Sequence, residues 1–232
     1  GLRRVDLGWT LVAGTLLAID FGFWIAATQL TTIANSLILA NLAPVWVLLL
    51  AACRLRRRPC TRDLQIVTLS VAGAAIVTGG GFAAFTGAAD LGNLLAIVSS
   101  IPAAAFLVVS ATAPRHLPMP VYLVLAWSWA TALLLMADLA VGAAWPTGHD
   151  ALLAILAMGI LAQLLGHGLL TWSLRWLSPC YVAVCCLAEP LLGGLLGVLY
   201  FQDQIGAEAL AGGLLILLAI YLGARVERPG AG

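Results

Sequence analysis

Long apolar runs without a charged residue make up most of this chain, and they are the feature that most limits its fold. Charged residues delimit four such runs, at 63–90, 90–115, 115–138 and 150–175. Each run is long enough for a helix of about 20 residues that crosses the hydrocarbon core of a bilayer. The chain of 232 residues is 62% hydrophobic and 9% charged, and a soluble domain of this length could not bury so much apolar surface. The sequence therefore predicts an integral membrane protein.

The rest of the chain holds four more apolar stretches of similar length. The stretch 7–53 contains one charged residue, Asp20, and as a single helix it would be about 70 Å long, more than twice the hydrocarbon thickness. We expect it to fold back at the polar segment 28–32, and two further spans follow residue 175. We predict an all-α, polytopic bundle of eight transmembrane helices. Their expected ranges are 7–28, 31–53, 63–84, 91–113, 119–142, 151–174, 178–201 and 205–224.

The positions of the basic residues predict how these helices lie in the membrane. All 11 basic residues are arginines, and they fall before the first expected helix or after the second, fourth, sixth and eighth. These connections all lie on one side of an eight-helix bundle. Basic residues concentrate in the cytoplasmic loops of membrane proteins. We therefore expect a multi-pass protein of the cell membrane with both termini in the cytoplasm.

Two parts of the chain match at a single offset of 146 residues. Gly22 then falls on Gly168 and Pro44 on Pro190, and the first three expected helices fall on the last three. Because the two sets of helices cross the membrane in opposite directions, the match predicts an inverted repeat. Inverted repeats are typical of transporters whose substrate site lies near the midplane of the bilayer.

The repeat divides the chain into two unequal domains. The first, 1–84, holds three expected helices, and the second, 85–232, holds five. The first domain lacks counterparts of the two helices that open the second. We therefore expect the gene to encode two further helices upstream.

Two stretches carry a resemblance to a known family. LANLAPVWVLLLAA at 39–52 and the segment 174–223, which contains CCLAEPLLGGLLG, resemble the two signature stretches of EamA-type members of the drug/metabolite transporter superfamily. Pro44-Val45 matches the Pro-Val of the family's first repeat, and Glu189-Pro190 matches the Glu-Pro of its second. The resemblance implies ten helices in two inverted five-helix repeats, of which this chain would be an N-terminally truncated remnant. It also implies movement of metabolites across the bacterial inner membrane, often outward.

Glu189 and Pro190 lie together about halfway along the seventh expected helix. A carboxylate at the bilayer centre costs about 2.5–3.5 kcal/mol on insertion scales, so we expect Glu189 to face protein or a cavity. Proline has no N–H, and Pro190 therefore frees the carbonyl of Cys186. Two interpretations stay open: Glu189 binds a substrate amine or a coupling proton, or the pair forms a kink with a satisfied polar partner.

Two other expected helices carry polar groups at mid-depth. Asp20 and Trp24 are one turn apart and share a face, where a carboxylate beside an aromatic ring could hold an organic cation or make a hydrogen bond between helices. Gln163, His167 and Thr171 recur every four residues and form one polar stripe. His167 could titrate near neutral pH, or it could serve as a neutral donor between helices.

Asn41 and Asn93 complete the candidates, as residues that either line a cavity or tie helices together. Gly193 and Gly197 have the GxxxG spacing of close helix packing, with homodimer formation as the alternative. The candidate substrate-binding or coupling residues are Asp20, Trp24, Asn41, Asn93, Gln163, His167 and Glu189. The structural-motif residues are Pro44, Pro190, Gly22, Gly168, Gly193 and Gly197.

Together these features predict a secondary transporter that exports small metabolites by alternating access. We expect the protein to contact membrane lipid, and protons are a candidate coupling ion. We expect no enzymatic activity, cofactor, metal or nucleic-acid partner. The net charge is only +1, and the chain has no HExxH motif, nucleophile elbow or CxxC pair. Two other functions stay open: an intramembrane acid–base enzyme that uses Asp20, His167 and Glu189, and a membrane scaffold that transports nothing.

Overall fold

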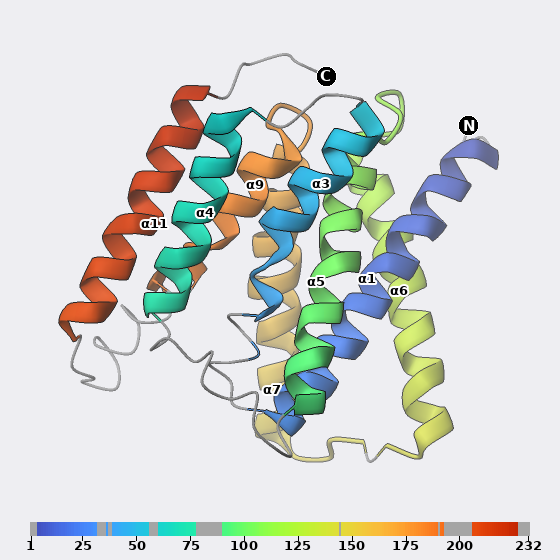
Figure 1. Cartoon of the computed structure of the whole chain (residues 1–232). Coiled ribbons are helices and arrows are strands. Elements are labelled where there is room, and N and C mark those ends of the chain that lie inside the picture. Colours follow the sequence, from blue (N-terminus) through green and yellow to red (C-terminus); the bar gives the residue numbers. More distant parts are fainter. Residues whose placement is uncertain are drawn as a thin grey trace.

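The computed structural model describes residues 4–31, 36, 39–55, 60–77, 90–143, 145–189, 191–192 and 206–226. Within these residues all regular structure is helical, which confirms the expected all-α class. The longer helices are α1 (Arg4–Leu30), α5 (Asp90–Ala111), α6 (Met119–Val141) and α11 (Ala207–Val226) (Figure 1). The others are α3 (Ala43–Leu55), α4 (Thr61–Val77), α7 (His149–Ala157), η2 (Met158–His167), α8 (Gly168–Ser173) and α9 (Pro179–Cys186).

Four segments of described helix are long and apolar enough to cross a membrane. They are Val5–Leu30, Asp90–Ala111, Met119–Val141 and His149–Ser173. These segments correspond to the first, fourth, fifth and sixth expected spans, and they support the expected multi-pass membrane protein. The remaining four expected spans each include residues outside the described ranges, so the count of eight stays a prediction.

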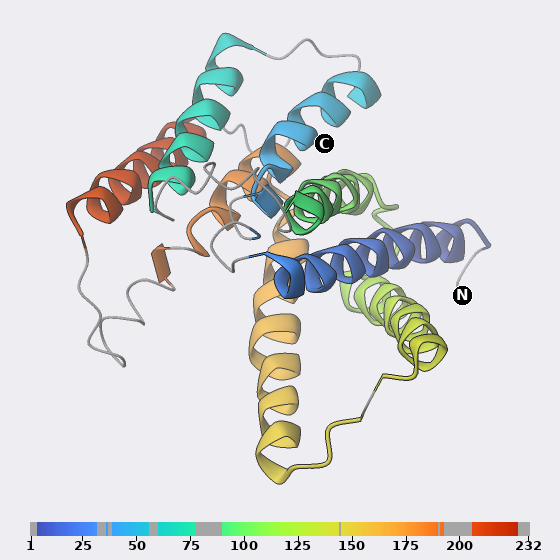
Figure 2. The same cartoon turned by 60° about the horizontal axis from the view of Figure 1, so that its bottom comes forward.

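Helix α1 is the centre of one packed group, with α5 and α6 on either side of it (Figure 2). Small residues let the backbones approach closely. A methyl group at Gly14 would lie only 2.3 Å from the carbonyl oxygen of Ala126, so glycine is needed at this crossing. Membrane helices associate through such close packing, because lipid tails are as apolar as the side chains. Leu17 and Tyr122 are buried in the core that the group shares.

Helices α4 and α11 form a second packed pair (Figure 1). A methyl group at Gly73 would lie 2.7 Å from the carbonyl oxygen of Gly212, so this pair also depends on glycine. Helix α3 contacts both α5 and α9, and α9 contacts α11, so these two helices connect the groups. Thr61 begins α4 and Ala207 begins α11, which is the offset of the expected repeat. The inverted relation of the two repeats stays a prediction.

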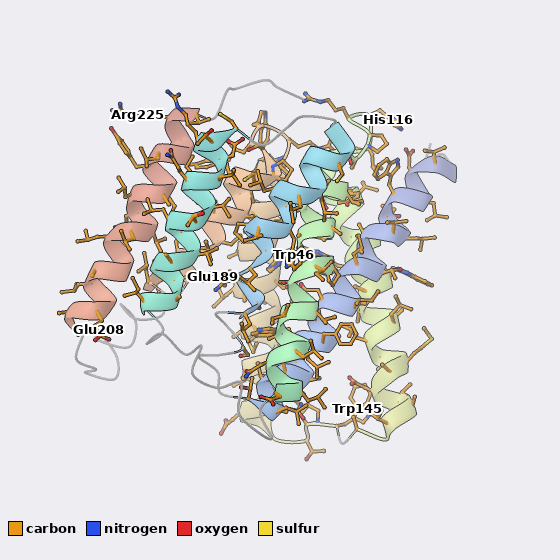
Figure 3. All side chains as sticks on the ribbon, in the orientation of Figure 1. Trp46, His116, Trp145, Glu189, Glu208 and Arg225 are labelled. Carbon is orange, nitrogen blue, oxygen red and sulfur yellow. The ribbon has the colours of Figure 1, made fainter. Side chains whose placement is uncertain are left out.

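Three arginines lie at one end of the bundle. Figure 3 places His116 and Arg225 at one end and Glu208 at the other. Arg115 adjoins His116 in the sequence, and Arg175 donates a hydrogen bond to the carbonyl of the residue that follows His116. Arg115, Arg175 and Arg225 therefore lie at the same end, which we call the arginine end. This grouping agrees with the sequence, whereas the compartment that the arginine end faces stays a prediction.

The sixth expected span is a continuous helix made of α7, η2 and α8, but its middle is not α-helical. Residues 158–167 form a π-helix, and the N–H of Gly168 bonds to the carbonyl of Gln163, five residues earlier. A π-helix of this length is rare, and a hydropathy pattern does not encode the hydrogen-bond register. Apolar side chains are exposed on this helix, with Leu161 63% and Leu164 56% exposed, which suits contact with lipid.

Candidate functional site

The helix that carries Glu189 is interrupted just before this residue. α9 begins with a capped turn, in which Ser178 Oγ accepts a hydrogen bond from the N–H of Tyr181, and it ends at Cys186. The next N–H groups bond only three residues back, Leu187 to Val184 and Ala188 to Cys185. The continuous helix expected over 178–201 is therefore broken within the described residues.

Proline chemistry explains the position of this break. Pro190 has no N–H to donate to the carbonyl of Cys186, so this bond of a continuous helix cannot form. In the tightened turn, the N–H groups of Leu187 and Ala188 bond to carbonyls three residues back and not four, which keeps these groups paired. Pro190 itself lies outside the described residues, as do Gly193 and Gly197, so the GxxxG packing stays a prediction.

Glu189 follows the break directly and presents an exposed side chain. Figure 3 shows it at about mid-height of the bundle. A carboxylate at this depth is unfavourable in hydrocarbon, and such residues usually face a cavity or a polar partner. The break and the carboxylate thus occur together, at the level where the sequence predicts a substrate site.

The middle of α1 lies beside the end of η2. The rings of Phe21 and His167 meet edge to face, with centroids 5.8 Å apart and an interplanar angle of 62°. Phe21 adjoins Asp20, which is half-buried, as is Trp24 one turn further on. The structure therefore brings together the two elements that carry Asp20 and His167, although these residues are far apart in the sequence.

The predicted polar stripe on the sixth span is partly engaged in packing. Thr171 is fully buried, and its Oγ1 donates to the carbonyl of His167 at 2.7 Å. Gln163 and His167 are half-buried within η2. A methyl group at Gly168 would lie 3.4 Å from the Trp127 ring, an ordinary van der Waals distance, so the indole packs close to this part of the helix.

Asn93 ties two helices together. It is 1% exposed, and its Oδ1 accepts a hydrogen bond from Thr31 Oγ1 at 2.7 Å, which joins the start of α5 to the end of α1. Asn41 differs, because its buried Nδ2 has no hydrogen-bond partner among the described residues. Such a donor costs about 1–3 kcal/mol when it stays unpaired, so Asn41 is the more suitable of the two for a ligand.

Two tryptophans outside the predicted site residues also place indole N–H groups inside the bundle. Trp46 Nε1 donates to Ser100 Oγ at 2.8 Å, between α3 and α5. Trp127 Nε1 is buried without a partner among the described residues. Pro44 lies two residues before Trp46. It is buried in the first turn of α3, where proline is tolerated. No local pattern marks either tryptophan, because each acts through a helix distant in the sequence.

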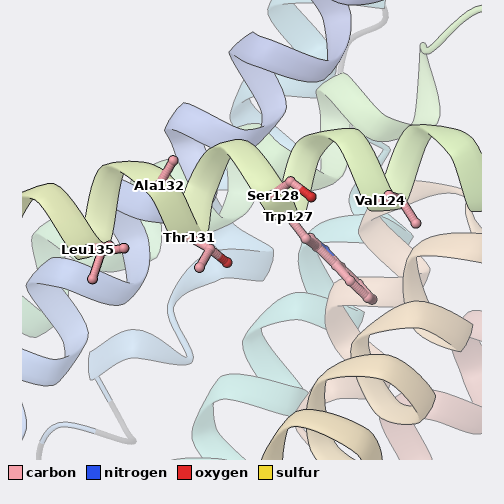
Figure 4. A pocket seen from close by; sticks show the side chains of 6 residues that line it. All are labelled: Val124, Trp127, Ser128, Thr131, Ala132 and Leu135. Atoms are coloured by element: carbon pink, nitrogen blue, oxygen red, sulfur yellow. The ribbon is translucent and has the colours of Figure 1, made fainter. Parts of the chain in front are cut away.

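Trp127 also lines a shallow groove on one face of α6 (Figure 4). The other lining residues are Val124, Ser128, Thr131, Ala132 and Leu135. None of the predicted site residues lines this groove. Among the described residues, no group of three or more His, Cys, Asp or Glu side chains could hold a metal ion.

The comparison with known families decides the class of this protein. Residues 90–224 match the EamA-like transporter family, a segment that runs from the first residue of α5 into α11 and covers more than half of the chain. The chain belongs to the EamA-like transporter family. The predicted resemblance is confirmed over this segment.

The fold of this EamA-like protein is also found among solved structures. It is similar to one described as "Crystal structure of protein", with a TM-score of 0.80 and 22% sequence identity. The match covers 97% of this chain and 80% of that chain. At this identity the likeness concerns the fold alone. Family membership makes this a membrane transporter of the drug/metabolite type.

Proposed function

We propose that this EamA-like protein is a secondary transporter that exports small metabolites by alternating access. The observation that carries the proposal is the break in the helix before Glu189, at mid-height of the bundle. Transporters commonly build their substrate and ion sites at the midplane from interrupted helices, where opened backbone and polar side chains meet. The family match supports transport as the class of activity.

The substrate site that we propose lies between α1, η2 and the segment after α9. It contains Asp20 and Glu189 as carboxylates, His167 as a donor or acceptor, and Trp24 as an aromatic surface. Carboxylates beside an aromatic ring favour an amine or another organic cation. π-Helices are frequently found at functional sites, and η2 carries both Gln163 and His167.

The membrane orientation and the coupling are part of the same proposal. The arginine end faces the cytoplasm, because basic residues are retained on that side. The domains 1–84 and 85–232 rock against each other around the site, as inverted repeats do in other secondary transporters. Protons serve as the coupling ion, and Glu189 carries them.

Counterflow in proteoliposomes tests the transport function. A thermal-shift screen of amino acids, amines and nucleosides first selects compounds that stabilise the purified protein. Liposomes loaded with an unlabelled selected compound should then accumulate its labelled form transiently, and protein-free liposomes should not. Mass spectrometry of the recovered label should find it chemically unchanged.

The outcomes separate the three functions. A transporter exchanges the label without altering it, and an intramembrane enzyme would convert it to a product. If compounds bind but none is exchanged or converted, the scaffold is the correct function and the transport proposal is wrong.

A further inference from the structure

The continuous helix α7–η2–α8, which we call the joined helix, is the predicted repeat counterpart of α1. At the offset of 146 residues, Gly22 of α1 falls on Gly168. α1 begins at Arg4 and the joined helix at His149, within one residue of the same offset. α5 and α6 cover α1 from two sides (Figure 2). The repeat therefore predicts that two helices also cover the joined helix.

The joined helix has no such cover among the described residues. α7 and η2 contain no buried residue, and Figure 2 shows α7 standing away from α6. Buried residues of α1 and their exposed counterparts in the joined helix are Asp6 with Leu152, Thr10 with Leu156 and Ala13 with Gly159. The same repeat positions are thus packed against protein in one domain and open in the other. We call the exposed residues of 151–166 the open face.

Small residues on the open face indicate that a helix packs there. Ala162 and Gly166 are four residues apart, about one turn, and such pairs let the backbones of membrane helices approach closely. α1 packs on α6 through a residue of this kind, Gly14. A methyl group at Gly159 would meet nothing within 4 Å, and one at Gly166 would meet only a carbonyl oxygen of its own helix. The open face therefore has both the composition and the room for a helix interface.

We propose that the open face is the docking site for two apolar membrane helices of the same polypeptide, encoded directly upstream of residue 1. They pack on α7 and η2 as α5 and α6 pack on α1. The order of the elements points to this source. α5 and α6 directly precede the joined helix, so in the repeat their counterparts directly precede α1. The proposal goes beyond the transport function and does not depend on it.

Two other occupants fit the open face less well. A second copy of this chain would have to offer its α5 and α6, which are already packed against its own α1. Lipid tails need no small residues, and they would leave Gln163 and His167 close to hydrocarbon, where polar groups are unfavourable. Both side chains are half-buried in η2, and a docked pair of helices would separate them from lipid.

Photo-cross-linking in the product of the complete gene tests the proposal. A diazirine-bearing amino acid replaces Leu156, whose counterpart Thr10 is fully buried, and on illumination it reacts with whatever lies beside it. Mass spectrometry of proteolytic fragments should find most of the cross-linked peptide joined to a segment encoded upstream of residue 1. In the 232-residue chain alone, the same probe should react with lipid.

A probe at Leu165 is the matched control on the same helix. Leu165 is 49% exposed and its counterpart Ile19 is 42% exposed, so the repeat predicts a lipid-facing position in both domains. The probe at Leu165 should react mainly with lipid, in the complete gene product and in the 232-residue chain alike. If thermal unfolding shows that the replacement of Leu156 prevents folding, the probe is placed at Leu152 and judged by the same criteria.

Each result decides the proposal. Cross-links from Leu156 to the upstream segment, with lipid adducts from Leu165, support it. A gene that encodes no pair of apolar helices directly upstream of residue 1 overturns it, as do lipid adducts from Leu156 in the complete gene product. Covalent dimers joined at Leu156 would show that a second copy covers the open face, and this result also overturns it. The cross-link needs no substrate, so it decides the proposal whether or not counterflow detects transport.

Discussion

Trp46 donates from its indole nitrogen to the hydroxyl of Ser100 at 2.8 Å, and the two residues are 54 positions apart in the sequence. The Ser100 hydroxyl donates onward to the carbonyl of Ile97 at 2.6 Å. Figure 3 shows Trp46 near mid-height of the bundle. Hydrogen bonds in such a chain polarise and strengthen one another. These two hydrogen bonds connect α3 with α5 at the depth where the proposed substrate site lies.

Trp46→Phe should destabilise the protein by removing this donor. The loss of one hydrogen bond corresponds to about 0.5–1.5 kcal/mol in the free energy of unfolding, and the smaller ring adds a packing cost. Denaturant unfolding in mild detergent measures the difference. A double-mutant cycle with Ser100→Ala isolates the interaction. If the two effects are additive, the hydrogen bond contributes nothing to stability.

Gly14→Ala should destabilise the α1–α6 crossing. The added methyl group would lie 2.3 Å from the carbonyl oxygen of Ala126, so the helices must separate, at a cost of about 1–3 kcal/mol. Gly8→Ala is the matched control on the same helix, because a methyl group there meets nothing within 4 Å. Thermal unfolding should distinguish the two variants. Equal melting temperatures would show that the crossing relaxes without cost.

The sequence predicted the helices well where hydropathy alone determines them. The bounds of α1, α5 and α6 differ by only a few residues from the expected 7–28, 91–113 and 119–142, because a bilayer fixes the length of an apolar helix. Backbone hydrogen bonding was harder to predict. The π-register of η2 and the end of α9 at Cys186 depend on local backbone geometry that hydropathy does not encode, although Pro190 did mark the region of the break.

The tertiary contacts could not be predicted from the sequence. His116 pairs with Asp6 across 110 positions, and Arg175 reaches the Leu117 carbonyl across 58. A periodic pattern identifies the buried face of a helix but not the helix that covers it. Among the predicted site residues, Asn93 could be assigned to helix pairing only once Thr31 was placed beside it.

Labelling of Cys60 should determine which compartment the arginine end faces. Cys60 is exposed and directly precedes α4, within the predicted arginine-rich connection. In a variant that keeps only this cysteine, a membrane-impermeant maleimide should label inside-out vesicles and leave intact spheroplasts unlabelled. Trp145→Cys in a cysteine-free background should show the opposite pattern, because Trp145 is exposed at the other end (Figure 3). Labelling of Cys60 in spheroplasts would contradict the proposed orientation.

Glu189→Gln should separate a coupling carboxylate from one that only shapes the helix break. Glutamine keeps the size and a hydrogen-bonding group but cannot titrate, and Pro190 still interrupts the helix in this variant. If Glu189 carries the coupling proton, the variant should fold and exchange substrate in counterflow. It should no longer accumulate substrate in response to an imposed proton gradient, and its exchange rate should lose the pH dependence of the wild type. Glu208→Gln is the matched control, since Glu208 is exposed at the far end of the bundle (Figure 3) and should respond like the wild type. If Glu189→Gln keeps both the gradient response and the pH profile, Glu189 belongs to the architecture of the break, and the coupling ion binds elsewhere.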